Sequence, residues 1–279
     1  MMKWLGLTPF AVYVLLFLGV PAVLAIGTGF FGPDGSFTFD NLATLVDPVV
    51  LGSFWASIWV SALTAIVGAV LGALLSFALA GAKPGGLLRR AIDSAASVLA
   101  QFGGVMLAFA FIATIGIQGI ITVLLRDSFG IDIFENGVWL YQLPGLILPY
   151  LYFQVPLMVI VFLPAMEGLR REWAEASATL GGGTFTYWGR IAGPILAPSF
   201  LGSLLLLFAN AFSSYATAAA LISQGSQIVP LQIRAALIAE TGASRANTAG
   251  ALALGMLIVM LMVMLGYSAL QRRAARWQR

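Results

Sequence analysis

Cysteine and histidine are both absent from the 279-residue chain, and charged residues make up only 9% of it. Without cysteine there is no disulfide framework, and without histidine there is no Ser-His or Cys-His catalytic pair and no histidine metal site. The phosphate-binding pattern G-x-x-x-x-G-K-[ST] does not occur either. We therefore expect this chain to be no enzyme, and to hold no metal ion and no cofactor of its own.

Apolar residues are abundant: they make up 60% of the chain, and its mean hydropathy is +0.97. Soluble domains usually carry about 25% charged residues, so this composition is typical of an integral membrane protein. A helix that crosses the bilayer needs about 20 mostly apolar residues. Six segments qualify, at approximately 9–30, 53–80, 94–124, 143–163, 195–222 and 248–270. We expect a single all-α membrane domain over residues 1–279, with six transmembrane helices.

Glycine marks two of these segments. A GxxxG pattern at Gly68 and Gly72 predicts close contact with another helix. Four glycines interrupt the third segment, at Gly103, Gly104, Gly116 and Gly119. It is therefore either one span or a span followed by a re-entrant or interfacial piece around 117–125. The first segment could be a cleaved signal peptide, but its apolar run exceeds the ~7–15 residues of a signal core.

Lysine and arginine are distributed unevenly between the loops. With the N-terminus inside the cell, 11 of the 14 basic residues lie in inside segments: Lys3, Lys83, Arg89, Arg90, Arg170, Arg171, Arg190, Arg272, Arg273, Arg276 and Arg279. The outside segments hold Arg126, Arg234 and Arg245. Since cytoplasmic loops carry the excess of positive charge, both termini are predicted to be inside. The 11 acidic residues, Glu240 among them, all avoid the middle of a span, unlike the charged groups of ion pathways.

The loop between the fourth and fifth spans, residues 168–193, faces the cytoplasm in this topology. Its first part, "REWAEASATL", is rich in helix formers. Three consecutive glycines beginning at Gly181 are expected to end that helix, because glycine readily adopts a left-handed cap. Thr184 is expected to cap a second short helix, and Pro194 to lie in the first turn of the fifth span. The sequence thus predicts a compact, rigid projection on the cytoplasmic face.

This loop resembles the EAA loop of ABC-importer permeases. The resemblance rests on six residues at matching offsets: Glu175, Ala176, Ser177, Gly181, Ile191 and Pro194. The chain departs from the family pattern at Ser177, Gly182, Trp188 and Gly193, of which Gly193 replaces a leucine. The position between the fourth and fifth of six spans also agrees with the family.

The resemblance implies a type I importer permease, N-in and C-in, whose loop is a coupling helix for a cytoplasmic ABC ATPase dimer. Glu175 would make the polar contact, Ala176 and Ser177 the close approach, and Gly181 the turn, with Trp188 and Ile191 as apolar anchors. ATP and Mg would be bound by the ATPase. The other implied partners are a second permease, identical or homologous, an outer solute-binding protein and the lipid of a bacterial inner membrane, with no nucleic acid.

Two apolar segments bear on the substrate, and two other functions are alternatives to an importer permease. The segments "FQVPLMVIVFLPAMEGL" and "SSYATAAALI" resemble the polyamine, phosphonate and ferric-iron branch of these permeases. Residues 229–246 could form a landing surface for a binding protein or a plain interfacial connector. The alternative function is a self-contained secondary carrier or channel, which would need an ion site in the membrane. A membrane enzyme or scaffold ranks last, because the sequence contains no nucleophile–base pair.

Overall fold

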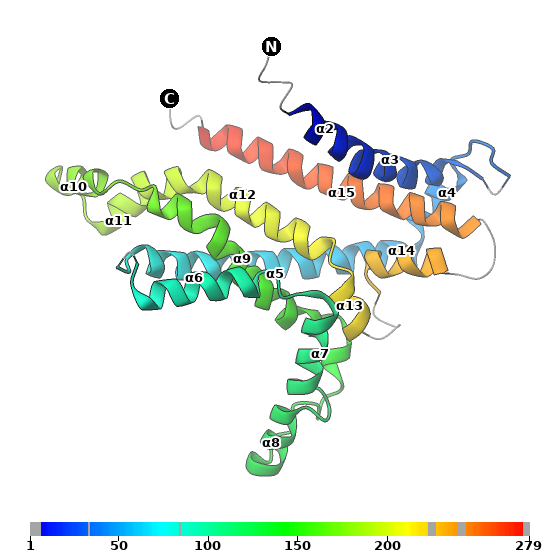
Figure 1. Ribbon diagram of the computed structural model, residues 1–279, viewed down its shortest axis with the longest axis horizontal. Helices are drawn as coiled ribbons and strands as arrows, with labels where there is room; N and C mark the ends of the chain where they lie inside the picture. The colour runs from blue at the N-terminus through cyan, green and yellow to red at the C-terminus, as the bar shows by residue number, and fades with distance from the viewer. Residues whose placement is uncertain (1–6, 33, 84, 223–226, 239–243, 276–279) are drawn as a thin grey trace. The chain divides into compact units, whose positions relative to one another are not determined.

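The computed structural model describes residues 7–32, 34–83, 85–222, 227–238 and 244–275, and their regular structure is helical (Figure 1). Six stretches are long and apolar enough to cross a membrane: Thr8–Phe30, Pro48–Ala80, Gly104–Phe129, Leu143–Glu167, Thr184–Phe212 and Asn247–Leu270. The expected all-α architecture with six spans is therefore confirmed. Lys3, Glu240, Arg276 and Arg279, which entered the predicted charge distribution, lie outside the described residues.

The chain forms two compact units, Met1–Trp55 with Gln227–Leu261 and Ala56–Ser226 with Met262–Arg279. The first unit contains α2 (Thr8–Val14), α3 (Val20–Gly27), α4 (Asp40–Ala43), α14 (Val229–Ile238) and the first parts of α5 (Pro48–Ala80) and α15 (Ser244–Ala275). A π turn, Leu15–Gly19, joins α2 to α3. Glycines bring the end of this first span against α15: a Cβ atom at Gly29 would lie 2.7 Å from the backbone nitrogen of Ala251.

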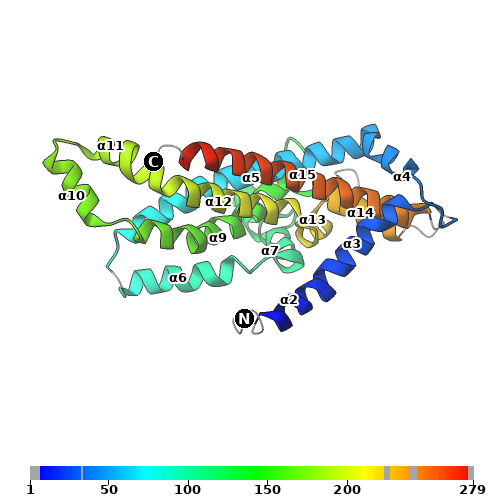
Figure 2. The same cartoon turned by 90° about the horizontal axis from the view of Figure 1, so that it is seen from above.

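The second unit contains the remaining helices: α6 (Leu87–Leu99), α7 (Gly104–Ile115), α8 (Ile120–Phe129), α9 (Ile147–Glu167), α10 (Arg171–Thr179), α11 (Thr184–Tyr187), α12 (Gly193–Phe212) and α13 (Ala216–Leu221). Both views draw α10 and α11 together where α9 ends and α12 begins (Figures 1 and 2). The loop of interest is therefore attached to the ends of two long helices of the same unit.

The GxxxG pattern is a contact between α5 and α9, as the sequence predicts. A Cβ atom at Gly72 would lie 2.7 Å from Met158 Cγ and 2.8 Å from the carbonyl oxygen of Val155. A Cβ atom at Gly68 would lie 2.9 Å from Oε1 of Gln154. The missing side chains let the two backbones approach closely, which is how helices pack in lipid.

A polar contact fixes the register of the same two helices. The Gln154 amide donates a hydrogen bond of 3.1 Å from Nε2 to the hydroxyl oxygen of Thr64, and both side chains are fully buried. Close packing alone is tolerant of sliding, whereas a hydrogen bond between buried side chains favours one register.

The third predicted segment, 94–124, differs most from the structure. It is divided among α6, α7 and α8, with breaks at residues 100–103 and 116–119. Helix α6 runs antiparallel to α9, as shown by contacts along its length. Arg89 pairs with Glu167, Ala96 packs with Val159 and Leu163, and Phe102 and Phe111 contact Tyr152. The fifth predicted segment, 195–222, is likewise interrupted, because α12 ends at Phe212 and α13 follows at Ala216.

We expect Gly72→Ala to lower the free energy of unfolding by about 1–3 kcal/mol, because the new methyl group overlaps Met158 and Val155. Gly52→Ala is the matched control, since it lies on the same helix with open space around it. Alanine there should leave stability unchanged or raise it by up to ~1 kcal/mol. Thermal unfolding of both variants in mild detergent compares them directly. Equal midpoints would contradict the α5–α9 contact.

Candidate functional site

The turn after α10 is a complete glycine cap. Gly181 has φ +79°, the left-handed conformation that the sequence predicts for this glycine run. Its N–H donates to the carbonyl oxygen of Ala178 at 3.0 Å, and the N–H of Gly182 donates to that of Ser177 at 2.8 Å. These two bonds define a Schellman motif, which satisfies the last carbonyl groups of the helix. The turn is therefore rigid, although it lies in a loop.

The three residues of the Glu-Ala-Ser triplet do not share one face. Glu175 and Ala176 are exposed, whereas Ser177 is buried beneath the turn. A Cβ atom at Gly182 would lie 2.6 Å from the Ser177 hydroxyl oxygen. Ser177 and Gly182 therefore pack inside the loop, and its outer surface is left to their neighbours.

The second short helix is not a separate element. Helix α11 continues through a π turn, Trp188–Ala192, directly into α12. Thr184 does not cap it: the N-cap residue is Gly183, and no side chain caps the helix. Pro194 lies in the first turn of α12, as predicted. The expected return to the membrane is thus one uninterrupted helical rod from residue 184 to 212.

Gly193 is explained by the π turn. Its N–H bonds to the carbonyl oxygen of Trp188, five residues earlier, which closes the wide turn. A Cβ atom at Gly193 would lie 2.6 Å from that oxygen. The departure from the leucine of the family pattern therefore accompanies a local change of helix type, since π turns insert one residue into a helix.

Trp188 anchors the loop to the chain's own helices. Its ring meets that of Phe77 on α5 edge to face, with centroids 5.3 Å apart, and contacts Tyr187. Together with Phe162 and Phe200 it lines a shallow, open apolar groove of about 470 Å³. Ile191 is half-buried on the same turn. The aromatic contact, worth about 0.5–1.5 kcal/mol beyond burial, fixes the start of the rod.

Two large apolar side chains project from either side of the glycine turn. Leu180 precedes it and is 89% exposed, and Phe185 follows it and is 96% exposed. With the exposed Glu175, they form what we call the loop tip: Glu175, Leu180 and Phe185. Apolar groups presented on a rigid support are typical of protein contact sites. The sequence predicted Glu175 but missed Phe185, whose exposure depends on how α11 leaves the turn.

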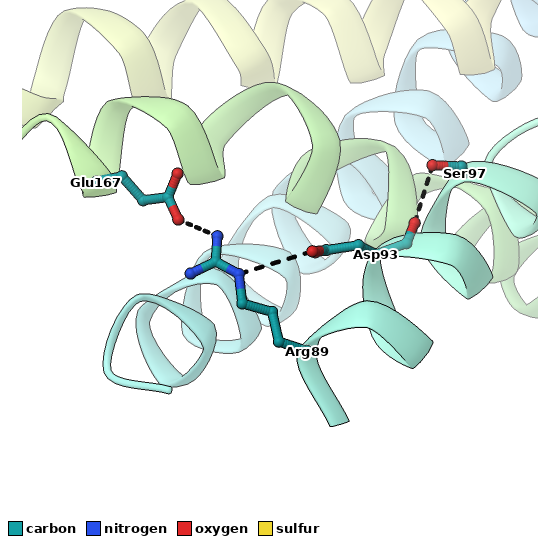
Figure 3. A network of polar contacts seen from close by, with 4 residues as sticks. All are labelled: Arg89, Asp93, Ser97 and Glu167. Carbon is teal, nitrogen blue, oxygen red and sulfur yellow. Dashed lines mark hydrogen bonds and ion pairs between the residues drawn. The ribbon is translucent and has the colours of Figure 1, made fainter. Parts of the chain in front are cut away.

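A polar network lies where the loop leaves α9 (Figure 3). Arg89 on α6 forms an ion pair with Glu167, the last residue of α9. Its Nε also lies 3.6 Å from Oδ2 of Asp93. The hydrogen bond that Arg89 donates to Glu167, followed by the negative charges of Glu167 and Asp93, raises the pKa of Arg89 above its ordinary value. The guanidinium is therefore cationic at every physiological pH.

Within the described part of the chain, no group of three or more His, Cys, Asp or Glu residues could hold a metal ion. The loop offers instead a rigid turn, an exposed carboxylate and two exposed apolar side chains. This arrangement can bind a partner and transmit its movement to α9 and α12.

Three solved structures with the same fold are informative. A chain of a bacterial ABC transporter involved in the import of the acidic polysaccharide alginate has a TM-score of 0.78 and 18% identity, with 98% of this chain and 95% of that chain covered. A chain of a bacterial alginate ABC transporter in complex with alginate pentasaccharide-bound periplasmic protein has a TM-score of 0.74 and 18% identity, with 98% of this chain and 94% of that chain covered. A chain of the MetNI methionine ABC transporter in an inward-facing conformation has a TM-score of 0.55 and 13% identity, with 82% of this chain and 99% of that chain covered.

No protein-family model and no curated protein sequence matches the chain. At identities of 18% and below, the likeness to the solved structures establishes a shared fold. The chain therefore has the fold of ABC-importer transmembrane subunits.

The turn itself can be tested by Gly181→Val. We expect the loop to loosen, because a β-branched residue disfavours φ +79° by more than ~1 kcal/mol. Gly183→Val is the control, since Gly183 has φ −82° and open space around it. A spin label on Leu180→Cys, in a chain that has no native cysteine, reports the mobility by electron paramagnetic resonance. Identical spectra for the two valine variants would contradict the role of the turn.

Proposed function

We propose that this chain is the transmembrane permease subunit of an ATP-driven, solute-binding-protein-dependent ABC importer. The observation that carries the proposal is the loop tip, held on a glycine turn between the fourth and fifth spans in a fold shared with ABC importers. The chain contains no P-loop, so ATP and Mg are bound by separate ATPase subunits.

The loop tip docks on the ATPase and transmits its movement. Leu180 and Phe185 enter an apolar cleft of the partner, and Glu175 makes a polar contact at its edge. Because α11 continues into α12 without a break, displacement of the tip moves the fifth span as a rod. Trp188 on Phe77 carries the same movement to α5. ATP-driven closure of the ATPases thereby changes the side of the membrane to which the permease opens.

The remaining parts of the assembly follow from the proposed class. The chain lies in a bacterial inner membrane with both termini in the cytoplasm, as its basic residues indicate. A second permease, identical or homologous, completes the pathway around a two-fold axis. A solute-binding protein delivers the substrate from outside, in keeping with the periplasmic protein bound to the alginate transporter of similar fold.

The proposed substrate is a polyamine, a phosphonate or ferric iron, and this part rests on the sequence resemblance in α9 and α12–α13. The solved structures of similar fold belong to transporters of alginate and methionine. A secondary carrier receives less support. In the described part of the six spans, the carboxylates Asp127 and Glu167 both lie within three residues of a span end.

The topology can be tested with single cysteines, because the chain has none of its own. Leu180→Cys should react with a membrane-impermeant maleimide only after the cells are opened. Ile131→Cys, which is 52% exposed on the opposite predicted side, should react in intact spheroplasts. The cysteine-free parent chain measures background labelling. The reverse pattern would exclude a cytoplasmic loop tip.

The coupling role can be tested by purifying the tagged chain from its natural host in mild detergent. The unaltered chain should bring with it a subunit that hydrolyses ATP, whereas Glu175→Arg with Gly181→Val should lose it by at least ~10-fold, equivalent to 1.4 kcal/mol. The matched control is Glu135→Arg with Gly183→Val, which makes the same chemical changes on the outer side and at the relaxed glycine. An unaltered chain that purifies without an ATPase would favour the carrier or channel.

A further inference from the structure

The loop leaves α9 at a charged junction. Glu167 is the last residue of α9, and α10 begins at Arg171, so three residues separate the ion pair from the helix that bears Glu175. Arg89 reaches Glu167 from α6, a helix 78 positions earlier in the sequence. The Arg89 side chain is only 14% exposed, whereas that of Glu167 is 42% exposed. Whatever holds Glu167 therefore also holds the base of the loop.

Arg89 is itself held in place. Its Nε lies 3.6 Å from the Asp93 carboxylate, one turn further along α6, and the guanidinium lies between the two acids (Figure 3). A planar guanidinium with several donors suits this bridging position, because it can bond two carboxylates from one fixed orientation. Arg89 is thus oriented before it meets Glu167.

Helix α6 is packed against its unit along one face and is separated from α7 by a break in the helix. Along its inner face, Ala96 packs with Val159 and Leu163 of α9 and with Leu79 of α5. At its far end, residues 100–103 break the helix before α7 begins. A helix that is bonded to α9 at one end and broken at the other can follow a movement of α9 while α7 stays in place.

We propose that Arg89 is a positioning residue that fastens the base of the coupling loop to α6, so that α6 moves with the loop during transport. The coupling role of the loop rests on the proposed function. The mechanical link between α6 and the loop does not depend on it. In an importer, the link delivers the ATPase stroke to α6, which precedes the third span, as well as to the fourth and fifth spans.

The first measurement needs no partner protein. Spin labels on Leu88→Cys of α6 and Leu180→Cys of the loop tip, both at exposed positions, report the spread of distances between them in the full chain in lipid nanodiscs. We expect Arg89→Gln and Glu167→Gln to widen the distribution. The charge-reversed pair Arg89→Glu with Glu167→Arg should narrow it again. Arg90→Gln is the matched control, because Arg90 is exposed and takes part in none of the described ion pairs.

High salt tests the link in the unaltered chain. Salt screens a partly exposed ion pair, so the distribution of the parent chain should widen as ionic strength rises, while that of Arg89→Gln should not change further. The salt response of the parent chain remains decisive if a variant does not fold. Unchanged distributions in Arg89→Gln and in the parent chain at high salt would overturn the proposal.

The second measurement uses the complex with its ATPase. Arg89→Gln should reduce solute uptake per ATP hydrolysed several-fold, with the KM for ATP unchanged, and the charge-reversed pair should restore it. Loss of hydrolysis and uptake in equal proportion would overturn the positioning role, because it indicates general damage. If the distances respond as expected but no ATPase accompanies the parent chain, the link stands and the importer function fails.

Discussion

A backbone that crosses lipid must satisfy its hydrogen bonds internally, and the second unit meets this constraint by joining two broken helices. Gly104 begins α7 after one break, and its N–H donates to the Thr217 hydroxyl of α13 at 3.0 Å. The same hydroxyl donates to the Gly104 carbonyl oxygen at 3.3 Å. At the break between α12 and α13, the Tyr150 hydroxyl donates to the carbonyl oxygen of Ser214 at 3.2 Å. Each break is therefore supplied with partners by a neighbouring helix, which fixes where α7, α9 and α12 meet.

The loop between α9 and α12 closes its glycine turn and its π turn with backbone hydrogen bonds. The N–H groups of Gly181 and Gly182 close the end of α10, and the N–H of Gly193 donates to the Trp188 carbonyl oxygen in the π turn that carries α11 into α12. Because no side chain is needed for these bonds, the side chains of Leu180, Phe185 and Glu175 are free to face outward. The backbone hydrogen bonds thus hold the turn in place and also leave the side chains of the loop tip exposed.

Features that depend on local sequence were predictable, and those that depend on tertiary contacts were not. Apolar run length identified the six spans, and the glycine run identified the left-handed cap at Gly181. The π turn at Gly193 and the burial of Ser177 were missed, because each depends on atoms several residues away. Gly103 and Gly104 marked the break at residues 100–103, but a hydropathy pattern cannot show that Thr217 replaces the lost helical bonds. The link from Arg89 to Glu167 joins residues 78 positions apart, a distance at which sequence periodicity carries no information.

The size of the loop tip bears on how the proposed importer works. Burial of Leu180 and Phe185 would contribute about 1.5–3 kcal/mol each, and this is offset by several kcal/mol of lost motional freedom on association. One loop alone therefore binds weakly. In the proposed importer, two permeases joined by a two-fold axis would present two tips to one ATPase dimer, and the second contact would form at the high effective concentration set by the first. If each tip binds the ATPase weakly but the two tips together bind it tightly, a tip can pivot during a cycle while the ATPase stays bound. The modest apolar surface of this loop is thus consistent with a paired permease and ill suited to a chain that binds its partner alone.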